Sequence, residues 1–365
     1  MTLAARLRTL APLVVPVIAL VALALTWGRS IPIGVVIVIG VVLVGAVLTA
    51  VHHAEVVAHR VGEPLGSIVL AVAVTVIEVG LIIMLMISGG DGAETLARDT
   101  AFAAVMITCN GIVGISLLLG SLRHDIPRFN PEGTGAALGV VATLAVLTLV
   151  VPTFTVGESG GEFTPAQLVF AAVAAVALYA AFIYTQTGRH RDFFLPVGAT
   201  GKPIEAEEHA VPPTTRATIL SAVLLVVSLV SVVGLAKVAS PAIEAGVAAA
   251  GIPNSFVGVV IAILVLLPEG LAAARAALRD RVQTSLNLAY GSAIASIGLT
   301  IPAIAIASIW LTGPLVLGLG PVQIVLLVLT LVVSTLTVVP GRATRLQGVV
   351  HLIILAAFVF LAIKP

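Results

Sequence analysis

The chain has 365 residues, of which 59% are hydrophobic and 10% are charged. A soluble domain carries about 25% charged residues, so this composition excludes a soluble enzyme or binding module and indicates a polytopic membrane protein. The formal net charge of +1 and the single cysteine, Cys109, point neither to a nucleic-acid partner nor to a disulfide framework. The lipid bilayer is therefore the expected surrounding.

Apolar windows long enough to cross about 30 Å of hydrocarbon predict eleven transmembrane helices. The first follows Arg6 and Arg8; it is longer than the apolar part of a signal peptide and no clear cleavage site follows, so we expect it to be retained. The break between the ninth and tenth windows depends on Thr312-Gly-Pro314 alone. The eleven windows lie near residues 10–27, 31–51, 65–87, 100–119, 135–151, 165–184, 217–236, 256–274, 286–311, 315–338 and 346–363.

The basic residues orient these spans. With a cytoplasmic N-terminus, the outer segments hold only Arg29, Arg98, Lys237 and Lys364, and every other Lys and Arg falls in an inner segment. Because cytoplasmic loops are enriched in Lys and Arg, this distribution predicts a cytoplasmic N-terminus and a C-terminus outside.

The spans divide into an extra helix and two halves. Residues 1–29 hold the extra helix, 30–186 a first repeat of five spans, 187–216 an acidic cytoplasmic linker, and 217–365 a second repeat of five spans. An odd number of spans in each half places the halves in opposite orientations, as in inverted-repeat transporters. For the linker, with Glu205, Glu207 and Glu208, we expect a solvated segment rather than a cation sensor.

Each half carries one carboxylic acid deep inside its second span. Glu78 lies in 65–87 and Glu269 in 256–274, and both spans are otherwise almost wholly apolar. A charged residue at that depth costs at least about 2.5–3.5 kcal/mol, and such residues usually mark an ion pathway or proton relay. We therefore expect Glu78 and Glu269 to form a paired transport site.

Further oxygen atoms accompany these acids. Thr75 shares the helix face of Glu78, although a membrane threonine often bonds only its own helix. Asn110 interrupts the span after Glu78, and Ser292 and Ser296 continue a stripe from Ser285 in the span after Glu269. Such a stripe serves equally well as a packing surface. We expect Thr75, Asn110, Ser292 and Ser296 to be secondary ligands.

Carboxylate, hydroxyl and amide oxygens suit Ca²⁺, and also Na⁺ or K⁺. Protons neutralise the same carboxylates, so proton and cation should compete, which predicts an antiporter without a bound cofactor. A cation channel is the alternative. No pattern of metal-ligating or nucleophilic residues within the spans favours an enzyme.

Six short motifs stand out in the chain: His59–Gly66, Thr75-Val-Ile-Glu78, Arg98-Asp99, Leu117–Gly120, Leu267-Pro-Glu269-Gly-Leu and Asn287-Leu-x-x-Gly-Ser292. Together they resemble bacterial calcium/proton antiporters of the ChaA type, in the cation/Ca²⁺ exchanger superfamily. The resemblance implies a ten-helix inverted-repeat core with a peripheral first helix, in a bacterial inner membrane, and Glu78 and Glu269 as ligands that bind Ca²⁺ and protons alternately. It leaves Na⁺ or K⁺ open as cargo, and a homo-oligomer open as the assembly.

Overall fold

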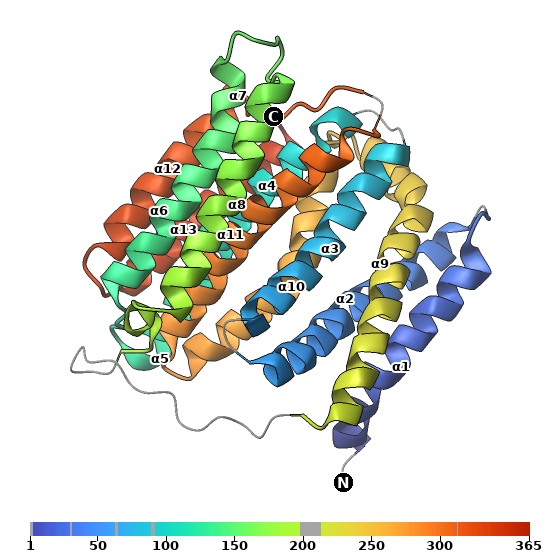
Figure 1. Cartoon of the computed structure of the whole chain (residues 1–365), viewed down its shortest axis with the longest axis horizontal. Helices are drawn as coiled ribbons and strands as arrows, with labels where there is room; N and C mark the ends of the chain where they lie inside the picture. Colours follow the sequence, from blue (N-terminus) through green and yellow to red (C-terminus); the bar gives the residue numbers. More distant parts are fainter. Residues whose placement is uncertain (1–2, 30, 63–64, 89–91, 198–212, 312) are drawn as a thin grey trace. The chain divides into compact units, whose positions relative to one another are not determined.

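The computed structural model describes the chain apart from residues 1–2, 30, 63–64, 89–91, 198–212 and 312, and this part is built from helices without a β-strand (Figure 1). Ten helical stretches are long and apolar enough to cross a membrane, and an eleventh apolar helix covers Leu10–Thr26. The predicted all-α polytopic fold is confirmed. The main helices are α1 (Leu3–Thr26), α2 (Ile33–Val61), α3 (Leu65–Ser88), α4 (Leu96–Met106), α5 (Val113–His124), α6 (Pro131–Ala145), α7 (Val151–Phe154), α8 (Pro165–Thr187), α9 (Thr215–Ala249), α10 (Phe256–Leu278), α11 (Val282–Ala307), α12 (Pro321–Val338) and α13 (Arg345–Ile363).

Three predicted spans are markedly longer in the structure than in the sequence pattern. The span predicted at 31–51 forms α2, which continues to Val61. Helix α9 continues past the predicted end at 236 to Ala249, because the stretch after Lys237 is rich in alanine, the best helix former, although it is less apolar. The predicted span 100–119 belongs to a continuous helical segment from Ala93 to His124, in which α4 and α5 are joined by a π-helix, η2 (Ile107–Ile112). The predicted break between α11 and α12 is confirmed.

The chain folds as two compact units. Unit 1 comprises Met1–Ala93 and His209–Val257, and unit 2 comprises Glu94–Glu208 and Gly258–Pro365. Each unit therefore contains helices from both halves of the sequence, so the units are not the predicted repeats 30–186 and 217–365. The acidic cluster of the predicted linker lies outside the described residues.

Unit 1 contains α1, α2, α3 and α9, and α2 packs extensively against α9. Small residues permit two further close contacts within it. A Cβ on Gly80 of α3 would lie 2.6 Å from Val233 of α9, and one on Gly234 would lie 2.6 Å from Leu23 of α1. Glycine therefore lets α9 approach both neighbours closely.

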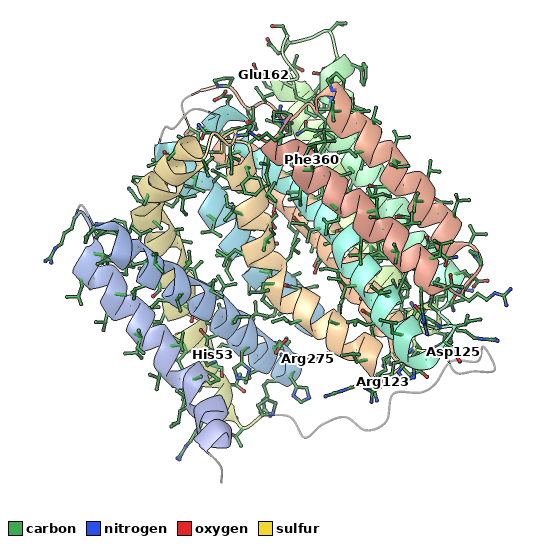
Figure 2. All side chains as sticks on the ribbon, turned by 180° about the vertical axis from the view of Figure 1, so that it is seen from behind. His53, Arg123, Asp125, Glu162, Arg275 and Phe360 are labelled. Carbon is green, nitrogen blue, oxygen red and sulfur yellow. The ribbon has the colours of Figure 1, made fainter. Side chains whose placement is uncertain are left out.

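His53 of α2 ties three helices of unit 1 together (Figure 2). Pro16 has no backbone N–H, so the carbonyl of Pro12, four residues earlier in α1, loses its helical donor. The Nε2 atom of His53 lies 2.8 Å from that carbonyl oxygen, and its Nδ1 lies 3.2 Å from the hydroxyl of Ser221 on α9. A carbonyl acceptor requires the proton on Nε2, so Nδ1 accepts from Ser221.

Unit 2 is organised around α11, which packs against α4, α5, α6, α8 and η2. Helices α5 and α13 cross through facing glycines. A Cβ on Gly348 would lie 2.8 Å from the backbone nitrogen of Leu118 and 3.0 Å from the carbonyl oxygen of Gly114. These are backbone atoms that cannot rotate away, so the crossing requires glycine.

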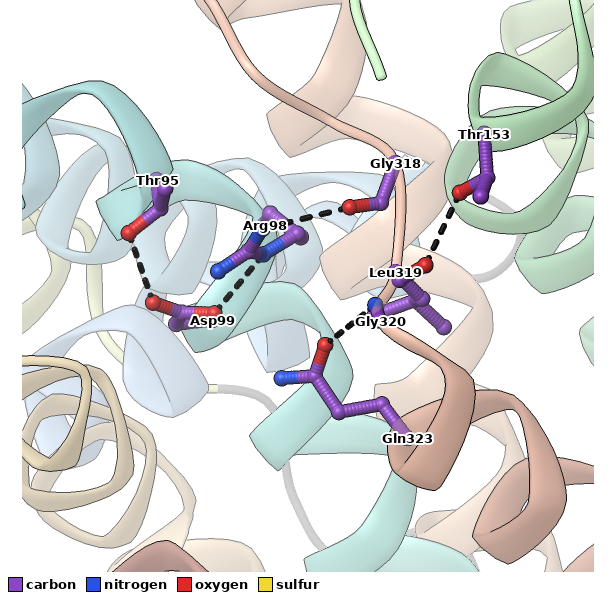
Figure 3. Close-up of polar contacts among 8 residues, drawn as sticks. All are labelled: Thr95, Arg98, Asp99, Thr153, Gly318, Leu319, Gly320 and Gln323. Atoms are coloured by element: carbon purple, nitrogen blue, oxygen red, sulfur yellow. Dashed lines mark hydrogen bonds and ion pairs between the residues drawn. The ribbon is translucent and has the colours of Figure 1, made fainter. Parts of the chain in front are cut away.

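Polar contacts around the start of α4 link this helix to the segment before α12 (Figure 3). Asp99 is 4% exposed, and its carboxylate accepts from Thr95 at 2.9 Å and from Arg98 at 2.8 Å. Arg98 also donates to the carbonyl oxygen of Gly318 at 3.2 Å, in the segment before α12. This buried carboxylate is thus engaged in joining the segment before α12 to α4.

Candidate cation site

Glu78 lies on α3 in unit 1 and is 3% exposed. Thr75, one turn earlier, is 8% exposed, so the acid and the hydroxyl share a buried face as their spacing predicted. Within unit 1, helix α3 packs against both α2 and α9. A carboxylate in this apolar span can be accommodated only if it is neutralised by a proton or a cation, or by polar partners.

Glu269 lies on α10 in unit 2 and is half-buried. Helix α10 stays continuous from Phe256 to Leu278 despite Pro268, which leaves the carbonyl of Leu264 without its helical donor. A Cβ on the adjacent Gly270 would be 3.8 Å from Ile112, the last residue of η2. The acid therefore lies on the turn of α10 that faces the π-helix.

The π-helix η2 places Asn110 in the centre of a buried polar chain. Its amide nitrogen donates to the hydroxyl of Thr330 on α12 at 2.9 Å, and its Oδ1 lies 3.1 Å from Nδ1 of His351 on α13. On the other side of the ring, Nε2 of His351 lies 3.1 Å from the hydroxyl of Thr337. Asn110, Thr330 and His351 are 0% exposed. A π-turn often marks a functional site in a helix.

The hydrogen-bond directions along this chain follow from the donor on Asn110. Because the amide nitrogen faces Thr330, its oxygen faces His351, and the imidazole must carry its proton on Nδ1. Its Nε2 then accepts from Thr337. An amide is not a ready proton carrier, so the chain fixes Asn110 in place rather than conducting protons. A cation would find only the second lone pair of its Oδ1.

The serine stripe of α11 begins with a residue that joins helices. The hydroxyl of Ser285 lies 2.5 Å from that of Ser116 on α5 and donates to the carbonyl oxygen of Ala273 on α10 at 2.8 Å, so it joins three helices. Ser292 is half-buried and Ser296 is 5% exposed, two and three turns further along. Of the two roles considered for the stripe, helix packing or cation binding, Ser285 therefore serves helix packing.

Four of the six predicted site residues, Glu269, Asn110, Ser292 and Ser296, belong to unit 2, on α10, η2 and α11. Glu78 and Thr75 belong to unit 1, and the pairing of the two acids stays a prediction. The partners of Asn110, Thr330 and His351, were not predicted from the sequence as site residues. A signal existed: Thr330, Ser334 and Thr337 recur on one face of an apolar span, and all three are buried.

The chain is similar to known proteins over most of its length. The sodium/calcium exchanger protein family matches residues 31–188 and 220–364. The putative ionic transporter y4hA of Sinorhizobium fredii (strain NBRC 101917 / NGR234) is 47% identical over 327 residues, covering 88% of this chain and 87% of that protein. The sodium-potassium/proton antiporter ChaA of Escherichia coli (strain K12) is 35% identical over 350 residues, covering 95% and 94%.

Solved structures show the same fold at low sequence identity. Native YfkE superposes with a TM-score of 0.73 at 15% identity, covering 98% of this chain and 99% of that one. The H⁺/Ca²⁺ exchanger CAX gives a TM-score of 0.69 at 17% identity, covering 98% and 92%. With its apolar spans, buried membrane carboxylate and two matched segments, the chain belongs to the sodium/calcium exchanger family of integral membrane transporters.

Proposed function

We propose that the protein is a secondary antiporter that exchanges a cation for protons by alternating access, with Glu78 and Glu269 as ligands shared by cation and proton. The observation that carries this proposal is the position of the two acids. Each occupies an otherwise apolar span, and Glu78 is 3% exposed. Membership of an exchanger family supports the same reading.

The exchange follows from electrostatics. A carboxylate that is ionised and unaccompanied in hydrocarbon is costly, so the states that can expose the site to either side are those in which protons or a cation neutralise the acids. A cation that enters displaces the protons, and protons that return displace the cation. Thr75, Ser292 and Ser296 would supply further oxygens. The Asn110 amide would contribute through its remaining lone pair or by positioning η2.

Two repeats would present these acids from opposite directions. The family matches residues 31–188 and 220–364, close to the repeats proposed at 30–186 and 217–365. The packing is also paired: α2 and α9, the first helices of the two repeats, contact each other, and the third helix of each repeat packs on the fifth of the other, α5 on α13 and α11 on α8. An internal two-fold relation would produce this pairing.

The cargo has two candidates. The resemblance that led to Ca²⁺ rests on motifs around Glu78 and Glu269. A monovalent cation is favoured by one specific observation: a relative 35% identical to this chain is a sodium-potassium/proton antiporter. Ca²⁺ takes six to eight oxygen ligands, and the commitment of Asn110 to His351 and Thr330 reduces the supply of free oxygen atoms.

Proton flux in everted vesicles tests this function. Dequenching of a pH-gradient dye after addition of Ca²⁺, Na⁺ or K⁺ should occur with the wild type and be lost in Glu78→Gln and in Glu269→Gln. The control is Glu158→Gln, which removes an exposed carboxylate and should behave as wild type. The cation that causes dequenching identifies the cargo. Wild-type vesicles that respond to none of the three would refute the antiporter for these cations.

A further inference from the structure

An apolar groove runs between α6 and α12 within the membrane-spanning part of unit 2, where these helices lie side by side (Figure 1). Its volume of about 370 Å³ lies within the range of about 300–1,000 Å³ found for small-molecule pockets. Apart from Glu132 and Thr335, its lining is made of apolar residues. The lining runs from Pro131 to Ala142 on α6 and from Leu331 to Val339 at the end of α12.

The length of the groove matches one leaflet of a bilayer. The lining residues of α6 extend from Pro131 to Ala142, which corresponds to about 16 Å at the rise of an α-helix. Half of the hydrocarbon thickness is about 15 Å. The floor is formed partly by Gly135 and Gly139, and a Cβ on Gly139 would meet nothing within 4 Å. A lipid chain is thus the occupant that fits the length and apolar lining of this groove.

Two arginines stand opposite each other at one end of the groove. Arg128 and Arg342 form an isolated antiparallel bridge just before α6 begins and just after α12 ends. The bridging bonds run from Phe129 N to Gly341 O and from Ala343 N to Pro127 O, so the two arginines form the closer, non-hydrogen-bonded kind of pair.

Like charges directly opposite each other are destabilising unless a group of opposite charge lies between them. Both arginines are exposed, and among the described residues neither forms an ion pair with a carboxylate. Arg345 starts α13 and contacts the carbonyl oxygen of Ser121, and Arg123, at the end of α5, adds a further positive charge at this end of unit 2 (Figure 2). Glu132 offsets part of this charge.

We propose that this groove binds an anionic phospholipid. The phosphate would lie between Arg128 and Arg342, since two guanidinium groups suit its oxygens, and one acyl chain would lie along Gly135 and Gly139. The site is separate from the proposed transport residues.

Native mass spectrometry of the full-length protein in mild detergent tests this site, with phosphatidylglycerol and phosphatidylcholine as probes. The wild type should retain phosphatidylglycerol in preference to phosphatidylcholine. In the double variant Arg128→Gln/Arg342→Gln the affinity for phosphatidylglycerol should fall about fivefold for each arginine, or about 25-fold for both. The control Arg29→Gln/Arg216→Gln removes the same charge from exposed positions of unit 1, outside the groove, and should keep the preference.

Gly139→Leu tests the acyl chain, because its side chain fills open space in the groove and should displace phosphatidylglycerol with both arginines intact. If this variant misfolds, the comparison of the arginine double variant with its control tests the proposal by itself. The proposal is overturned if the wild type retains both lipids equally or if the double variant matches its control. It is also overturned if inorganic phosphate displaces the lipid, or if Gly139→Leu dissociates an oligomer while lipid retention is unchanged, since a second copy would then fill the groove.

Discussion

His53 and His351 show how single polar side chains hold apolar helices together. Each imidazole is buried and uses both nitrogens, His53 on Pro12 and Ser221, and His351 on Asn110 and Thr337. In hydrocarbon there is no water to replace a lost partner, so each bond fixes a neighbour. His53 lies just after the predicted span 31–51 and His351 lies within the span 346–363. A sequence does not show which carbonyl or amide each histidine meets, since those partners lie far away in the chain.

Removal of His53 should loosen α1. His53→Leu leaves the Pro12 carbonyl without a donor, and membrane hydrogen bonds are worth about 0.6–2 kcal/mol each, so we expect a lower Tm in detergent. His52→Leu, at an exposed neighbouring position, is the control and should leave the Tm near that of the wild type. Equal Tm values for the two variants would contradict the bond.

Thr330→Val should destabilise unit 2 because it preserves the shape of the side chain and removes the acceptor of the Asn110 amide. We expect a loss of about 0.6–2 kcal/mol, measured by thermal unfolding. Thr335→Val on the same helix is the control, since that exposed hydroxyl bonds only its own helix, at Leu331. A larger loss in Thr335→Val than in Thr330→Val would argue against the buried chain.

At the scale of the elements, hydropathy located the helices well because burial in lipid needs only length and composition. It placed the ends of α2, of α9 and of the α4–η2–α5 segment too early, because helix propensity and packing extend helices beyond their apolar window. The π-turn at Ile107–Ile112 had no signal in the hydropathy pattern. It depends on contacts with α11, α12 and α13, which are distant in sequence.

The crossing of α5 and α13 gives a prediction at this scale. Gly348→Val should cause a large loss of folded protein, because its Cβ would lie 2.8 Å from a backbone nitrogen that cannot move aside. Gly246→Ala, whose Cβ would meet nothing within 4 Å, should fold as wild type. Size-exclusion chromatography of the two purified variants makes the comparison, and a monodisperse Gly348→Val peak at wild-type yield would contradict the crossing.

At the scale of the whole molecule, the orientation proposed from the basic residues predicts which ends a membrane-impermeant maleimide can reach. Cys109 is buried and is the single cysteine, so it gives little background. In intact cells Lys364→Cys should be labelled and Arg279→Cys should not, and everted vesicles should reverse the result. The opposite pattern would place the C-terminus inside.

A joint site of Glu78 and Glu269 is a property of the whole molecule. The sequence predicted both Glu78 and Glu269, because an acid in an apolar span stands out. A joint site would depend on how the repeats fold around each other, which no local pattern encodes. The compact units place Glu78 with α2 and α9, and Glu269 with η2 and α11, so a joint site rests on the exchange chemistry proposed above.

Proton release on cation binding is the most direct test of that joint site. Purified protein in weakly buffered detergent solution is mixed with the cation that supports flux, and a pH indicator counts the protons released. We predict release from the wild type and from Glu158→Gln, and much reduced release from Glu78→Gln and from Glu269→Gln. Cation binding by the wild type without proton release, or wild-type release from either acid variant, would contradict the shared site.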